Sequence, residues 1–174
     1  MAYKRTVAID LLYLLNFSLN DPKIDLIRVL SVDLPNIFSL AEYHKLTACV
    51  AFALENIGLD DETLKPWKQA KSMAIRKNIL LNNERKQIYD YMEDNSIIHV
   101  SLKGIVLQDF YPKFGMREMG DNDILYDPTY QEQMHDFMLS RGYHTEFYKK
   151  IHHDEYQKPP LYKGLSQFMV GKPL

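Results

Sequence analysis

A chain of 174 residues with 46% hydrophobic and 25% charged residues has the composition of an ordinary globular domain, and it is long enough to bury a core without disulfides. Its formal net charge of -2 argues against a broad nucleic-acid-binding surface, and its single cysteine, Cys49, excludes a disulfide framework within the chain. The sequence has no apolar run long enough to span a bilayer and no signal-peptide pattern, so we expect a cytoplasmic protein without membrane contact.

The first half of the chain has helical periodicity. Apolar residues recur at three- and four-residue steps over residues 5–19, which predicts an amphipathic helix. Asn20 or Asp21, followed by Pro22, is expected to start a short helix over 23–31. Residues 33–58 read as one longer helix that ends at Gly58, and residues 62–95 as a long amphipathic helix. Lysines on this last helix either guide a phosphate or form a solvated face, and composition favours the solvated face.

At Ser96 the pattern changes to short β-branched runs. Residues 96–104 predict a buried strand followed by a turn, 105–112 a helix, 113–120 a loop and 121–127 a second strand. A helix over 128–143 and one or two strands over 144–158 follow. The order indicates an α+β fold, with a helical region at 1–95, a mixed β-sheet core with flanking helices at 96–160, and an atypical tail at 161–174.

The second strand begins with two aspartates one residue apart. On a strand, the side chains of Asp121 and Asp123 project from the same face, while Asn122 projects from the opposite face. Two adjacent carboxylates repel each other unless a cation or proton lies between them. Mg²⁺, with Mn²⁺ as the alternative, prefers such oxygen ligands. An isolated D-x-D pair is nevertheless common at a solvated strand end.

Three upstream residues give this pair a chemical context. Gly104 lets backbone amides approach a ligand, and Lys103 adds positive charge to the same turn. Arg117, in the loop between the turn and the second strand, has a guanidinium suited to phosphate oxygens. Strand, Lys-Gly turn, arginine loop and D-x-D strand together predict a phosphate-plus-metal site. The P-loop spacing is absent.

The segment SLKGIVLQDFYPKFGMREMGDNDILYD, residues 101–127, resembles the signature of the uncharacterised nucleotidyltransferase family, a branch of the polymerase-β-like nucleotidyltransferase superfamily. The pattern is roughly L-K-G-x-x-L, then Y-P, then R-x-x-x-D-x-D-[IL]-L. The matching residues are Leu102, Lys103, Gly104, Leu107, Tyr111, Pro112, Arg117, Asp121, Asp123, Ile124 and Leu125. Weaker similarity extends over residues 1–160.

The resemblance implies a minimal nucleotidyltransferase-like core and transfer of a nucleoside monophosphate from an NTP to an acceptor. Asp121 and Asp123 would hold Mg²⁺ as catalytic residues, and Lys103 and Gly104 would lie along the nucleotide phosphates. Arg117 would neutralise charge on the transferring group. The acceptor, whether a small molecule or a macromolecule, cannot be named from the sequence.

The resemblance fails at one point. The family has a third carboxylate in an E-[IL]-H motif a little downstream of a Pro-Pro segment, but residues 161–174 contain no acidic residue and no histidine. We expect a truncated or altered tail rather than substitution by Asp154 or Glu155, because both precede Pro159. The sequence therefore leaves two functions open, an impaired nucleotidyltransferase and a catalytically inactive nucleotide-binding or interaction module. Adjacent His152 and His153 point to opposite strand faces, which argues against zinc.

Overall fold

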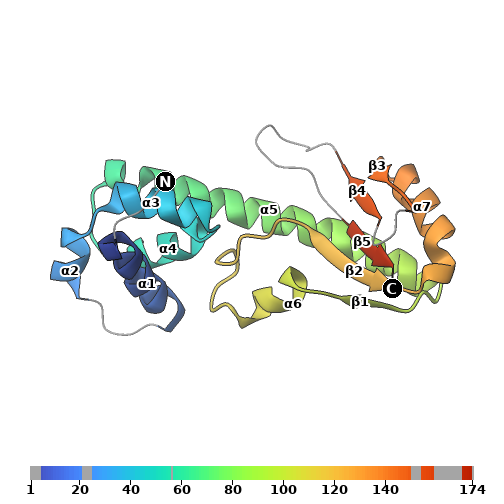
Figure 1. Ribbon diagram of the computed structural model, residues 1–174, viewed down its shortest axis with the longest axis horizontal. Coiled ribbons are helices and arrows are strands. Elements are labelled where there is room, and N and C mark those ends of the chain that lie inside the picture. Colours follow the sequence, from blue (N-terminus) through green and yellow to red (C-terminus); the bar gives the residue numbers. More distant parts are fainter. Residues whose placement is uncertain (1–4, 21–24, 56, 150–153, 159–169, 174) are drawn as a thin grey trace. The chain divides into compact units, whose positions relative to one another are not determined.

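The computed structural model describes residues 5–20, 25–55, 57–149, 154–158 and 170–173 (Figure 1). The chain folds into two compact units, one of residues 1–76 and 111–118, the other of residues 77–110 and 119–174. The helix α5 (Asp61–Asp94) contributes to both. This division follows packing in space and differs from the boundary at residue 95, which stays a prediction from composition.

The first unit is helical. It contains α1 (Arg5–Asn20), α2 (Leu26–Ser31), α3 (Leu34–Tyr43), α4 (Thr47–Leu54) and the beginning of α5. Its core is an apolar cluster in which the helices contribute residues at helical spacing, such as Val7, Leu11 and Leu14 of α1. Cys49 is buried in α4 as expected, and burial raises the pKa of its thiol.

Two expectations for this unit were wrong. Residues 33–58 form two helices, because the chain turns at Lys45, which has φ +57°, and the Leu46 N–H donates to the Ala41 carbonyl at 2.8 Å. This is a Schellman-type helix end, with a lysine where glycine is usual. The cap of α2 is Asp25, whose side chain accepts from the amides of the first turn, whereas Asn20 lies inside α1. Residues 21–24, including Asp21 and Pro22, lie outside the described residues.

The second unit confirms the α+β prediction. After α5 come β1 (His99–Ser101), α6 (Gly104–Leu107), the 3₁₀ turn η1 (Gln108–Phe110), β2 (Asn122–Tyr126) and η2 (Pro128–Tyr130). Then follow α7 (Gln131–Ser140), β3 (His144–Phe147), β4 (Glu155–Gln157) and β5 (Val170–Pro173). Strand β2 is central in a mixed sheet, antiparallel to β1 and parallel to β5, while β3 and β4 form a separate antiparallel pair.

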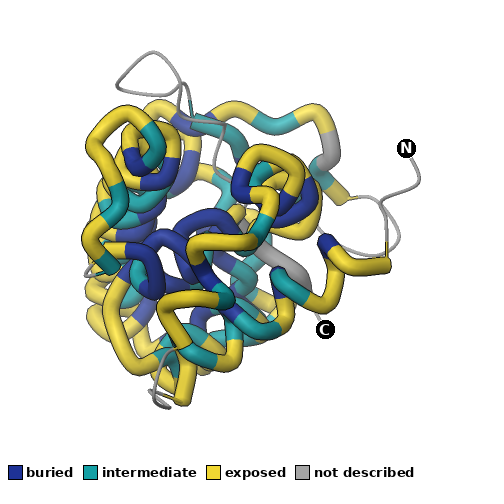
Figure 2. The backbone as a smooth tube through the Cα atoms, turned by 90° about the vertical axis from the view of Figure 1, so that its left-hand side faces the viewer, coloured by how far each residue is buried: buried dark blue, intermediate teal, exposed yellow. Residues whose placement is uncertain are grey.

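The core of the second unit lies between α5, β2 and α7. It is built from Leu81, Ile88 and Met92 of α5, Ile124 and Tyr126 of β2, and Met134 and Met138 of α7, with further residues around them. Figure 2 shows buried, intermediate and exposed stretches alternating along the backbone. Strand β1 is less buried than expected, because it is an edge strand and Val100 is 52% exposed. In the tail, 170–173 form β5, a strand the sequence did not predict, and residues 159–169 and 174 lie outside the described residues.

Candidate functional site

The turn after β1 and the start of β2 bring Lys103 and Asp123 together. Antiparallel pairing places Ser101 opposite Ile124, and it continues as the Leu102 N–H donates to the Asp123 carbonyl at 3.0 Å. The Lys103 ammonium then lies 2.9 Å from the Asp123 carboxylate. The lysine side chain is 62% exposed and the aspartate only 18%. A half-buried carboxylate thus holds a cation that is largely open to solvent.

Asp121 acts on the same ammonium. The hydrogen bond and charge of Asp123 raise the pKa of Lys103, and the negative charge of Asp121 raises it further. Burial alternates along β2, with Asn122, Ile124 and Tyr126 buried and Asp123 and Leu125 only partly buried. This alternation is what the sequence predicted, with Asn122 directed away from the face that carries Asp123. Asp121 lies immediately before the strand.

The backbone of Lys103 is strained. It has φ +46° and ψ -113°, a combination that glycine adopts readily and other residues rarely do. Residues 102–105 form a β-turn closed by the Ile105 N–H, which donates to the Leu102 carbonyl at 3.3 Å. Gly104, which the sequence marked for backbone flexibility, is the first residue of α6. The residue with the unusual backbone conformation is therefore Lys103, the same residue whose ammonium pairs with Asp123.

Arg117 belongs to the first unit, so the structure leaves its relation to the aspartates a prediction from the sequence. It is half-buried in the loop 111–118. This loop is fixed to α4 by Glu118, whose carboxylate accepts from the Thr47 hydroxyl at 2.6 Å and from the Ala48 amide at 2.9 Å. Glu118 thereby caps α4, whose own N-cap residue makes no side-chain hydrogen bond.

The strand beside β2 does not supply the third carboxylate. β5 runs parallel to β2, and its sequence Val-Gly-Lys-Pro contains no acid. Asp154 is fully buried, and its carboxylate accepts from the Gln131 side chain at 2.8 Å and from the Lys149 amide at 2.8 Å. These bonds tie Asp154 to α7 and to the backbone at Lys149, and whether it could replace the missing carboxylate stays a prediction from the sequence. Glu155 lies on β4. His152 and His153 fall outside the described residues.

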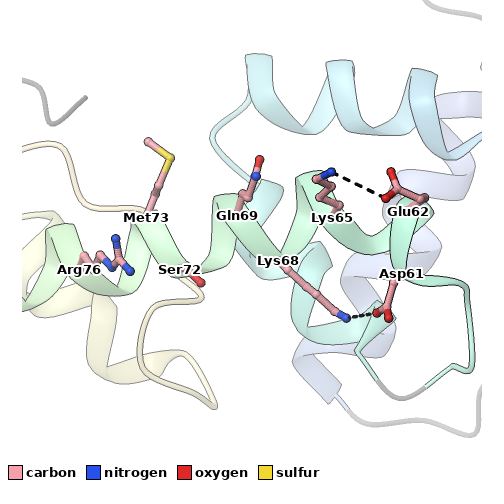
Figure 3. A pocket seen from close by; sticks show the side chains of 8 residues that line it. All are labelled: Asp61, Glu62, Lys65, Lys68, Gln69, Ser72, Met73 and Arg76. Atoms are coloured by element: carbon pink, nitrogen blue, oxygen red, sulfur yellow. Dashed lines mark hydrogen bonds and ion pairs between the residues drawn. The ribbon is translucent and has the colours of Figure 1, made fainter. Parts of the chain in front are cut away.

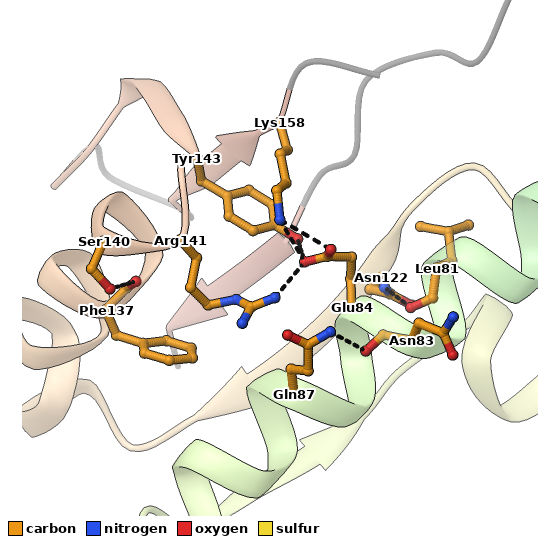
Figure 4. A network of polar contacts seen from close by, with 10 residues as sticks. All are labelled: Leu81, Asn83, Glu84, Gln87, Asn122, Phe137, Ser140, Arg141, Tyr143 and Lys158. Carbon is orange, nitrogen blue, oxygen red and sulfur yellow. Dashed lines mark hydrogen bonds and ion pairs between the residues drawn. The ribbon is translucent and has the colours of Figure 1, made fainter. Parts of the chain in front are cut away.

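The sequence did not identify a charged cluster around Glu84 (Figure 4). The Glu84 carboxylate accepts from Arg141 at 2.9 Å, from the Tyr143 hydroxyl at 2.9 Å and from Lys158 at 3.0 Å. Burial would raise the pKa of Glu84, but the hydrogen bonds from Arg141, Lys158 and Tyr143 outweigh it and lower the pKa. The partners lie 57 to 74 residues from Glu84, so no local pattern could have indicated the cluster.

A hollow of about 570 Å³ lies along the first part of α5 (Figure 3). It is lined only by exposed or half-buried residues of that helix, namely Asp61, Glu62, Lys65, Lys68, Gln69, Ser72, Met73 and Arg76. Lys68 pairs with Asp61 at 2.7 Å and Lys65 with Glu62 at 3.7 Å. Because two of its lysines already have acidic neighbours, this surface fits a solvated helix face better than a phosphate site.

The residues at the start of β2 fit a magnesium ion. Mg²⁺ typically binds proteins through one or two carboxylates and completes its coordination with water and substrate phosphates. Asp121 and Asp123 are the two carboxylates that would hold the ion, and Asp123 carries a positive partner already, the Lys103 ammonium at 2.9 Å. Within the described ranges, no group of three or more His, Cys, Asp and Glu side chains is placed to hold a metal ion. Nor is any helix there long and apolar enough to cross a membrane.

Comparison with known proteins identifies the family. No curated protein and no solved structure gives a significant match to the chain. The family model described as "Uncharacterised nucleotidyltransferase" matches residues 31–170, which include the Lys103 turn, the Arg117 loop, Asp121 and Asp123. The family's general activity is nucleotidyl transfer, with an NTP as the substrate this implies. The chain therefore belongs to the uncharacterised nucleotidyltransferase family.

Proposed function

We propose that the chain is a Mg²⁺-dependent nucleotidyltransferase that moves a nucleoside monophosphate from an NTP to an acceptor group. In this reaction an acceptor oxygen or nitrogen forms a bond to the α-phosphorus, and the bond from that phosphorus to the bridging oxygen breaks. Pyrophosphate leaves, and the acceptor loses its proton to solvent or to a nearby base. The metal, held by Asp121 and Asp123, would neutralise charge on the phosphate oxygens.

The observation that carries the proposal is the ion pair between the Lys103 ammonium and the Asp123 carboxylate, with Asp121 two residues away. The Lys103 ammonium is 2.9 Å from Asp123, and the hydrogen bond and charge of Asp123, with the charge of Asp121, raise the pKa of Lys103. Since its side chain is 62% exposed, it is free to turn from Asp123 toward a phosphate group when nucleotide and metal arrive. Gly104 and Arg117, carried over from the family signature, would contact the phosphates from the turn and the loop.

The missing third carboxylate supports a second candidate. Superfamily activity usually depends on that group, and the neighbouring strand β5 has none. Loss of one catalytic carboxylate leaves metal-nucleotide binding possible but lowers the rate by orders of magnitude. A nucleotide-binding module without catalysis is therefore the alternative, and an enzyme with reduced turnover is our first choice because the paired aspartates and the lysine are present together.

Calorimetry with ATP, GTP, CTP and UTP tests the shared part of both candidates. We expect at least one NTP to bind in Mg²⁺ and binding to fall at least tenfold in Asp121→Asn and Asp123→Asn. Asp109→Asn is the matched control, because it removes the same charge from an exposed position of the second unit. The absence of NTP binding with and without Mg²⁺ would refute both candidates.

Transfer of labelled NMP to acceptors in a cell extract separates the two candidates. An enzyme labels an acceptor in the wild type and loses this labelling in Asp123→Asn. A binding module shows Mg²⁺-dependent NTP affinity without any labelled product.

A further inference from the structure

Asn122 lies between the two aspartates, and both the nitrogen and the oxygen of its side-chain amide are hydrogen-bonded. The residue is 1% exposed and lies on the inner face of β2. Its Nδ2 donates to the Leu81 carbonyl at 2.9 Å, and its Oδ1 accepts from Arg85 Nη1 at 3.2 Å. Both partners belong to α5, and the bond to Leu81 is visible in Figure 4. An asparagine in an apolar core is costly unless it is bonded in this way.

A second asparagine, Asn78 of α5, holds the chain just before the two aspartates. The Met119 N–H donates to Asn78 Oδ1 at 3.3 Å, and both residues are buried. Positions 78, 81 and 85 recur at three- and four-residue steps, so a single face of α5 receives both attachments. Gly120 and Asp121 span the short segment between the attachments.

The strand pairing alone defines this end of β2 weakly. Pairing with β5 changes register between Asn122 and Leu125, and β1 pairs by residue only as far as Ile124. Apolar contacts are not directional, whereas an amide bonded through both its donor and its acceptor fixes a position along the helix. Because Asn122 lies between the two aspartates, a rotation of the backbone at Asn122 would change the directions of both aspartate side chains.

We infer that Asn122, held by Leu81 and Arg85 of α5, is a positioning residue that sets the two aspartate carboxylates for metal binding. This inference rests on the proposed function, since it concerns the same carboxylates. Asn122 and Arg85 themselves need not touch the metal or the nucleotide. They fix the backbone of residues 121–123, which carries the two aspartates. Helix α5 thereby supports the site.

Mn²⁺ titration of two variants tests the inference. Asn122→Leu keeps the size and burial of the side chain but removes both hydrogen bonds, and we expect the Mn²⁺ dissociation constant to rise at least tenfold. Ile88→Val is the matched control, because Ile88 is fully buried on α5, the helix to which Asn122 is hydrogen-bonded. It is expected to lower the melting temperature by a few degrees and to leave the Mn²⁺ dissociation constant within twofold.

In Arg85→Gln, the direction in which the Mn²⁺ dissociation constant changes distinguishes a positioning role of Arg85 from a purely electrostatic one. Removing a cation near two metal-binding carboxylates would tighten Mn²⁺ binding if electrostatics alone mattered. Loss of the anchor predicts the opposite, a dissociation constant raised several-fold. Tighter binding in Arg85→Gln, or unchanged binding in Asn122→Leu, would overturn the inference while leaving the proposed function intact.

Hydrogen exchange provides a readout that needs no metal. We expect the amides of residues 119–124 to exchange faster in Asn122→Leu than in Ile88→Val, with α7 unchanged in both. If the wild type binds neither Mn²⁺ nor NTP, the proposed function has failed and the assignment of a metal-positioning role fails with it. Localised exchange would then still establish the anchor. Equal exchange in the two variants would refute the anchor as well.

Discussion

Replacing Glu84 with glutamine should destabilise the protein more than any exposed charge change on the same helix. The Glu84 carboxylate is 13% exposed and its two cationic partners, Arg141 and Lys158, are each 20% exposed. Glutamine keeps the shape but leaves both cations facing a neutral group. Breaking a buried ion pair by removing one partner costs about 3–5 kcal/mol, and the partial exposure here argues for about 3 kcal/mol.

The assay is thermal unfolding followed by circular dichroism. For a protein of this size, about 3 kcal/mol corresponds to a melting temperature lower by roughly 6–12 °C. Asp90→Asn is the matched control, since Asp90 pairs with Lys86 on α5 at 2.8 Å with side-chain exposures of 52% and 74%. The distance is nearly the same, but Asp90 pairs with one exposed lysine, whereas Glu84 is mostly buried and accepts from three side chains. An exposed pair of this kind contributes about 0.3–0.5 kcal/mol, so the control should shift the melting temperature by less than about 2 °C.

The pH dependence of the same variant checks the charge of Glu84. Its pKa is lowered in the folded protein, so its stabilisation is fully present above the pKa of the unfolded chain, near 4.3. That stabilisation is lost as the pH falls through the folded pKa. The difference in melting temperature between the wild type and Glu84→Gln should therefore be constant at neutral pH and shrink in acid. A Glu84→Gln shift no larger than that of Asp90→Asn would refute the reasoning.

Three further changes have defined outcomes. Gly115→Ala should destabilise by about 2 kcal/mol or more in urea unfolding, because Gly115 has φ +89° and an added Cβ would lie 2.4 Å from Ile75 Cγ1; combination with Ile75→Ala should restore part of the loss. Glu118→Gln should lower the unfolding free energy by about 1 kcal/mol, since a neutral amide caps α4 less well, and no change would contradict the cap. Lys103→Gly should melt at a higher temperature than Lys103→Ala, because both variants lose the ion pair with Asp123 and only glycine relieves about 1 kcal/mol of backbone strain; Mg²⁺-dependent NTP binding should weaken in both. A glycine variant that melts no higher than the alanine variant would show that the turn is not strained.

The sequence was most informative where the structure depends on local periodicity. Alternation on a strand was enough to separate Asn122 from Asp123, and the burial pattern of β2 confirms it, whereas Asp121 lies just before the strand. Helical spacing located α1 and α5, and the helix expected over 128–143 is present as η2 and α7, followed by Gly142 with φ +80°. In each case, residues a few positions apart determine the result.

Tertiary structure decided the features that depend on distant residues. The break at Lys45 was missed because a lysine occupies the left-handed position, and α4 begins there with help from Glu118, 71 residues away. The cluster around Glu84 and the attachment of Asn122 to α5 likewise join residues separated by 37 or more positions. The sequence by itself determined which side chains share a face and which family signature they form. Only the folded chain determined which backbone and side-chain groups meet, because such contacts depend on packing between elements rather than on spacing within one.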